Sequence, residues 1–80
     1  MSNLLIKFVN DLNYEDKEKL NYNYKKFPYF IGEERDISVM LILEGVNNNP
    51  YWFPARFLIF SDDGKYVFIP NWLIDKKEIK

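Results

Sequence analysis

The sequence predicts a small α+β protein: N-terminal helical segments, then a three-stranded antiparallel β-meander, then a short C-terminal helix. Apolar residues in the first third recur at helical spacing, and those in the middle alternate with the period of a strand. Glycines and prolines stand between the segments. The 80 residues contain no repeat and no linker-like stretch, so we expect one compact domain over 1–80.

The first predicted helix is short. Five apolar residues share one of its faces: Leu4, Leu5, Phe8, Val9 and Leu12. A strand over 4–9 is the alternative, because Ile6 interrupts the helical pattern.

The second predicted helix follows Asn13. Two carboxylates stand near its start and two lysines near its end, which suits the helix macrodipole. Pro28 disfavours helical backbone at Phe27, so the helix is expected to end there.

The meander is predicted from Ile37 onward. Residues 37–44 alternate, with apolar side chains on both faces, as in a central strand, and 45–50 form a turn. Residues 51–60 form the next strand, in which Pro54 marks an edge, a bulge or a bend.

A hairpin and a helix complete the prediction. Residues 61–64 form a tight turn in which Gly64 takes a positive φ, and 65–69 form the third strand. Pro70 then begins a helix over 71–79. We expect Trp52 and Trp72 to fill the core, because a small sheet needs large apolar side chains.

The composition argues against catalysis and against cofactors. There is no Cys and no His, so disulfides, zinc-finger sites and the usual general base are all excluded. The three serines lie in no recognisable nucleophile setting. We therefore expect a protein that is not an enzyme and that binds no metal and no cofactor.

Acidic residues cluster at two places. Asp62 and Asp63 precede a glycine, where carboxylates form turns far more often than they bind a hard cation. Glu33, Glu34 and Asp36 are expected in a solvated loop. No apolar run approaches the ~20 residues of a membrane span, and the N-terminus lacks the features of a secretory signal. We expect a cytoplasmic protein, in the host cell if the protein is viral.

Two groups of residues are candidates for binding. Arg56 and Phe57 lie on an aromatic segment beside Pro54, as interface anchors often do. The other group interleaves aromatic and basic side chains, as in surfaces that bind single-stranded nucleic acid: Tyr22, Tyr24, Lys25, Lys26 and Tyr29. A helix end with dipole-matched lysines is the favoured alternative for the second group, because acidic residues share the segment.

The second half of the chain carries the motifs Tyr51-Trp52-Phe53-Pro54 and Val67-Phe68-Ile69-Pro70-Asn71-Trp72-Leu73, followed by Lys76 and Lys77. This order resembles a small module of unknown function that is common in phage and mobile-element proteins. The family commonly has Lys-Ser-Gln after the first proline, where this chain has Ala55-Arg56-Phe57. The resemblance implies a compact β-meander and a phage or mobile-element origin, and it implies no activity.

These observations predict a non-catalytic protein-binding factor. Small size, a net charge of −1 and 19% aromatic residues favour a protein that occludes a host complex. An anti-CRISPR protein, or another anti-defence or host-takeover protein, is the expected type. The alternative is an accessory protein that binds nucleic acid directly through an aromatic and basic surface. The near-neutral charge argues against a general nucleic-acid binder, and a homodimer is left open.

Overall fold

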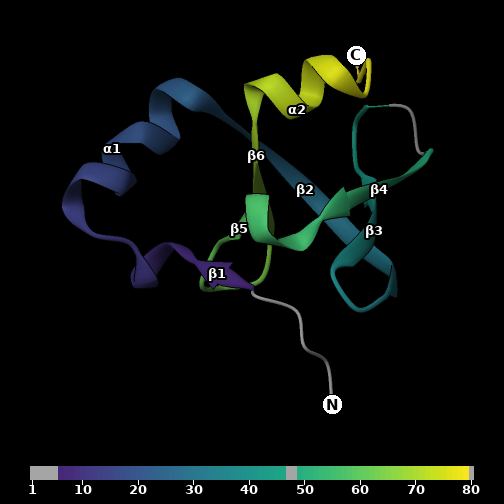
Figure 1. Cartoon of the computed structure of the whole chain (residues 1–80), viewed down its shortest axis with the longest axis horizontal. Helices are drawn as coiled ribbons and strands as arrows, with labels where there is room; N and C mark the ends of the chain where they lie inside the picture. The colour runs from purple at the N-terminus through teal and green to yellow at the C-terminus, as the bar shows by residue number, and fades with distance from the viewer. Residues whose placement is uncertain (1–5, 47–48, 80) are drawn as a thin grey trace.

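In the computed structural model, the described residues are 6–46 and 49–79, and they form one mixed β-sheet with two α-helices (Figure 1). The N-terminal elements are β1 (Lys7–Phe8), the 3₁₀-helix η1 (Val9–Asp11) and α1 (Tyr14–Asn23). They are followed by β2 (Tyr24–Glu34), β3 (Ser38–Leu43), β4 (Pro50–Pro54) and the 3₁₀-helix η2 (Ala55–Phe57). The last elements are β5 (Ile59–Phe60), β6 (Tyr66–Pro70) and α2 (Asn71–Lys76).

The α+β class is confirmed, but the predicted three-stranded meander is wrong. The sheet has six strands in the order β1-β5-β6-β2-β3-β4. The pairing of β1 with β5 is parallel, and every other pair is antiparallel. The difference arises mainly from β2, because this strand occupies a segment that was predicted to be a helix end and a loop.

Strand β2 joins two partners, and Pro28 stands where it passes from one to the other. Residues up to Pro28 pair with β6, and residues from Tyr29 onward pair with β3. A proline cannot donate to a ladder. Pro28 is the last residue that pairs with β6, and the pairing with β3 begins after it, so its missing N–H interrupts neither ladder. Strand β2 therefore continues through Pro28.

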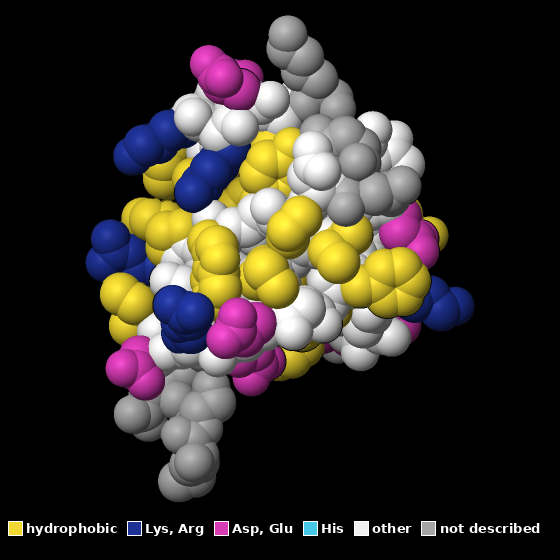
Figure 2. Space-filling model, turned by 90° about the vertical axis from the view of Figure 1, so that its right-hand side faces the viewer, with side chains coloured by type: hydrophobic (Ala, Val, Ile, Leu, Met, Phe, Trp, Pro, Cys, Tyr) yellow, Lys and Arg dark blue, Asp and Glu magenta, His cyan; other side chains and the backbone are white. Residues whose placement is uncertain are grey.

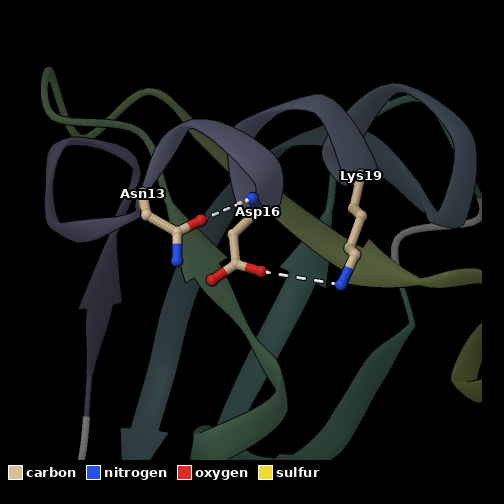
Figure 3. A network of polar contacts seen from close by, with 3 residues as sticks. All are labelled: Asn13, Asp16 and Lys19. Atoms are coloured by element: carbon tan, nitrogen blue, oxygen red, sulfur yellow. Dashed lines mark hydrogen bonds and ion pairs between the residues drawn. The ribbon is translucent and has the colours of Figure 1, made fainter.

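Helix α1 begins where it was predicted to begin and ends earlier. The Asn13 side chain accepts a hydrogen bond from the Asp16 N–H at 2.8 Å, which caps the helix (Figure 3). The helix ends at Asn23 and packs against β2 through a surface that includes buried Leu20. The predicted helix before it is wrong: its described part is β1 followed by η1, while Leu4 and Leu5 lie outside the described residues.

The core lies on one face of the sheet. Buried and half-buried residues alternate along β3, with Val39, Leu41 and Leu43 directed inward. Their neighbours in the main buried cluster come from all later elements and the C-terminus: Phe53, Ala55, Leu58, Phe60, Val67, Ile69, Leu73, Ile74 and Ile79. The central-strand prediction for β3 is confirmed, because β3 lies between β2 and β4.

Helix α2 corrects the prediction for Trp72. Leu73 and Ile74 are buried against the core, whereas the preceding Trp72 is 51% exposed. Helix α2 starts one residue after Pro70. Consecutive side chains of an α-helix point about 100° apart, so only one side of α2 faces the sheet. Trp52 was also predicted to be core, and it is half-buried on the opposite face of the sheet.

The turn predictions were partly confirmed. Gly64 has φ +74 in the hairpin before β6. The irregularity expected at Pro54 is present, because β4 ends there and η2 interrupts the strand predicted over 51–60. Helix α2 ends at Lys76, short of the predicted 79.

Candidate functional site

The outer face of β2, β3 and β4, opposite the core, carries apolar side chains. Phe30 pairs in register with Ile42, and Ile42 with Pro50. In the next rank Met40 pairs with Trp52. We call these five residues the apolar sheet face. Antiparallel sheets that have one face open to water usually carry polar residues on that face. The apolar composition found here indicates an interaction surface.

The degree of exposure supports this interpretation. Phe30 is 59% exposed, and the other members of the face are half-buried or exposed. Ile37 adds apolar surface in the bend between β2 and β3 at 75% exposure, whereas Ile31, 45% exposed, pairs in register with inward-facing Leu41 and lies on the other side of the sheet. On the side of the molecule where β3 and β4 lie, hydrophobic side chains form a belt across the surface (Figure 2).

Arg35 and Glu33 form the border of this face near Trp52. The Arg35 guanidinium carbon lies 4.7 Å from the Trp52 ring centroid, and its Nε lies 3.6 Å from a Glu33 oxygen. The Arg35 N–H also donates to the Ser38 carbonyl at 2.8 Å, which orders the bend. Both side chains of this ion pair are well exposed, so the pair is weak and Arg35 adds a positive charge to the border.

Carboxylates and one lysine make up the rest of this border. Glu33 and Glu34 end β2, where a loop was predicted, and Asp36 lies in the bend that follows. Glu44 follows β3 directly, and its N–H donates to the Pro28 carbonyl at 2.9 Å. All four side chains are exposed. Glu34, however, pairs in register with inward-facing Val39, and Lys65 lines a hollow together with Phe30 and Glu44. The border of the apolar sheet face therefore carries charges of both signs.

Gly32 allows Met40 to lie across β2. The register shifts between Ile31 and Glu33, which places a bulge at Gly32. A Cβ at this position would lie 2.6 Å from Met40 Cε. The absence of a side chain at position 32 therefore leaves room for the thioether on the apolar sheet face.

The edge of the sheet beside this face is protected. Strand β4 is the last in the sheet order, and prolines stand at both of its ends. Prolines at an edge discourage the addition of a further strand. The face of the sheet, rather than its edge, is the surface open to a partner.

The structure brings three of the predicted binding residues together. Tyr24, Arg56 and Phe57 line a cleft of about 150 Å³ with Lys7 and Lys19. We call this the cationic cleft; its remaining lining residues are Leu12, Asp16 and Ile59. The Arg56 guanidinium carbon lies 4.6 Å from the Phe57 ring centroid.

The other predicted binding residues lie elsewhere. Tyr22 and Lys25 are exposed outside the residues that line the cleft. Lys26 lies with its Nζ 4.1 Å from the Tyr66 ring centroid. Tyr29 packs against Phe60 with the ring centroids 5.2 Å apart.

Burial raises the pKa of two tyrosines. Desolvation is the larger cause at both Tyr24 and Tyr29, and a nearby carboxylate adds to it: Asp16 beside Tyr24 and Asp63 beside Tyr29. Both phenols therefore keep their proton, and their capacity to donate a hydrogen bond, throughout the neutral range.

Sequence reasoning missed the apolar sheet face, and it missed Lys7, Lys19 and Trp72 near the cationic cleft. The face had a recognisable signal in β3, where the outward residues Met40 and Ile42 are as apolar as the inward ones. The two lysines carried no signal, since their approach to Arg56 depends on contacts between distant segments.

Comparison with protein-family models, with curated proteins and with solved structures finds no match for this chain. The resemblance of the second half to a phage module therefore stays a prediction. Among residues 6–46 and 49–79, no three side chains of metal-ligating type are grouped together. No helix in the described part of the chain has the length and apolar composition needed to cross a membrane.

Proposed function

We propose that this chain is a non-catalytic protein-binding factor that docks its partner on the apolar sheet face. The exposure of Phe30 carries the proposal, because this ring is 59% exposed and pairs in register with Ile42. Exposed rings within contiguous apolar surface are typical anchors of protein interfaces. Burying such surface on a partner is favourable by about 25 cal/mol per Å² before the costs of association.

The proposed partner has an apolar centre and a border of mixed charge. Glu33, Asp36 and Glu44 lie at the border of the apolar sheet face together with Arg35 and Lys65. Complementary charge at such a border accelerates association and selects partners more than it adds affinity.

The expectation that the partner belongs to a host complex is part of the proposal. It is supported by the small size of the chain and by the resemblance to a phage module, and anti-CRISPR or other anti-defence activity follows from the same resemblance. A cytoplasmic partner fits this expectation.

Affinity capture with matched variants tests the proposal. The tagged wild type, Phe30→Ser and Tyr14→Ser are incubated with lysate of the cells from which the protein comes. Tyr14 is 76% exposed on α1 and serves as the control for loss of an exposed ring. We expect the same protein to be retained by the wild type and by Tyr14→Ser and lost from Phe30→Ser, with all three equally folded by circular dichroism. Equal retention by both variants would refute docking on this face.

A further inference from the structure

The cationic cleft is a second surface, distinct from the apolar sheet face, and its three basic residues come from distant parts of the chain. Lys7 belongs to β1, Lys19 to α1 and Arg56 to η2. The whole chain has a net charge of −1, so this grouping is a local feature that the overall composition does not produce. Such a local excess of positive charge favours an anionic ligand.

Two of the three basic side chains are available to a ligand. Within residues 6–46 and 49–79, neither Lys7 nor Arg56 has an ion-pair partner. Lys19 lies 3.8 Å from Asp16, and both side chains are substantially exposed (Figure 3). An exposed pair at this distance is weak, so Lys19 can exchange this carboxylate for a phosphate. Asp16 is the only carboxylate among the described residues lining the cleft.

Aromatic rings continue the surface beyond the cleft. Lys19 and Tyr24 also line an adjoining hollow that contains Asn71 and Trp72. Phe57 packs edge-to-face with Trp72 at 5.0 Å between ring centroids. This contact holds the orientation of the Trp72 indole while half of its surface stays open to solvent.

Asn71 has an acceptor that lacks a donor. Its Nδ2 donates to the Tyr22 carbonyl at 3.1 Å, which assigns the opposite position to Oδ1. This Oδ1 is buried and has no hydrogen-bond partner among the described residues. An unpaired buried acceptor is unfavourable, and because this atom has almost no accessible surface, a ligand on the surface does not reach it.

We propose that the cationic cleft and the adjoining hollow bind single-stranded nucleic acid. Backbone phosphates lie against Lys7, Lys19 and Arg56, and a base stacks on the exposed ring of Trp72. An acidic peptide is the competing ligand for the cations. Its carboxylates make no use of an exposed indole, whereas a nucleobase supplies a flat π-face that stacks on the ring.

The size of the cleft limits the mode of binding. At about 150 Å³ it is smaller than a typical small-molecule pocket. The strand therefore runs across the mouth of the cleft, with successive phosphates near Lys7, Lys19 and Arg56. Three phosphate contacts predict a slope of about −2 for the logarithm of affinity against the logarithm of salt concentration, which is roughly a 20-fold loss between about 50 and 200 mM.

Fluorescence anisotropy with a short labelled single strand of mixed sequence tests the proposal. Arg56→Gln should weaken binding severalfold and reduce the salt slope by about 0.7. Trp72→Ala should weaken binding about 5- to 150-fold, as expected for one lost stacking platform. Lys65→Gln, an exposed position outside the cleft, and Phe30→Ser should both bind like the wild type.

Two results would overturn the proposal. One is wild-type affinity in Arg56→Gln, a variant that should stay folded because its side chain is exposed, even where Trp72→Ala proves unstable. The other is tighter binding of a labelled glutamate-rich peptide than of the single strand, which would assign the cleft to an acidic protein segment. Phe30→Ser leaves the cationic cleft intact. Failure of the nucleic-acid proposal is therefore distinguishable from failure of the proposed docking on the apolar sheet face.

Discussion

The neighbouring residues Trp72 and Leu73 provide a sharp test of how α2 packs. Leu73 is 3% exposed within the core, whereas Trp72 is 51% exposed. Truncating each to Ala removes a large apolar side chain from the same short helix. The sequence predicted that Trp72 is a core residue whose loss would unfold the protein. The structure predicts instead that Leu73→Ala lowers the stability more than Trp72→Ala does.

The expected magnitudes follow from burial. Leu73→Ala should lower the free energy of unfolding by about 3–5 kcal/mol, because it leaves a cavity. Half of the area of a large aromatic ring is about 100 Å², and its loss has an upper bound of about 2.5 kcal/mol. Ala is also the better helix former. Trp72→Ala should therefore cost about 1–2 kcal/mol, out of about 4–12 kcal/mol expected for a domain of this length.

Thermal unfolding followed by circular dichroism measures both variants. Trp72→Ala should stay folded with Tm lowered by about 5–15 °C. Leu73→Ala should lower Tm by about 12–40 °C. If Trp72→Ala proves as unstable as Leu73→Ala, the placement of α2 is wrong, and Trp72 is not available as a stacking platform.

Three smaller predictions concern the hairpin and one buried phenol. Gly64→Val should destabilise the protein by about 1–2 kcal/mol in urea unfolding, because φ is +74 there, whereas Asp62→Asn should be nearly neutral. The hydrogen bond from the Ser61 hydroxyl is the main cause that lowers the pKa of Asp63 below 3.8. The ionised Asp63 therefore stabilises the folded protein above that pH, and this stabilisation is lost as the pH falls further. Asp63→Asn should show a shallower acid transition. Burial, and then a nearby carboxylate, raises the pKa of Tyr24 above 10, so stability should fall as the pH rises past 10, and less steeply in Tyr24→Phe. Equal slopes for variant and wild type would contradict either pH prediction.

Segments governed by local chemistry were predicted from the sequence. Alternation identified β3, and the hairpin at Gly64 was identified by its acidic residues and glycine. Asn13 was recognised at the start of α1 because carboxylates follow it. In each case a few neighbouring residues determine the conformation.

Segments governed by distant partners were not predicted. Strand β2 contains Pro28, and its strand conformation depends on β6 and β3, which lie far along the chain. Strand β1 has two residues, and it exists because it pairs with Ile59 and Phe60 of β5. Such pairings depend on tertiary contacts, which outweigh local preferences.

The binding surfaces were predicted in part for the same reason. Arg56 and Phe57 are neighbours in sequence, so their proximity could be anticipated, and Tyr24 joins them only through the fold. The apolar sheet face requires the register of β2 with β3, which places Phe30 beside Ile42, and that of β3 with β4, which places Ile42 beside Pro50. The sequence of a single strand does not specify its register with the neighbouring strands.

Site-specific photo-crosslinking tests the central claim most directly. A benzophenone side chain is introduced in place of Phe30 in one variant and in place of Tyr14 in another, and both are irradiated in the cells from which the protein comes. Docking on the apolar sheet face predicts a covalent adduct with one partner protein from position 30 and none from position 14. An adduct from position 14, with none from position 30, would contradict the account.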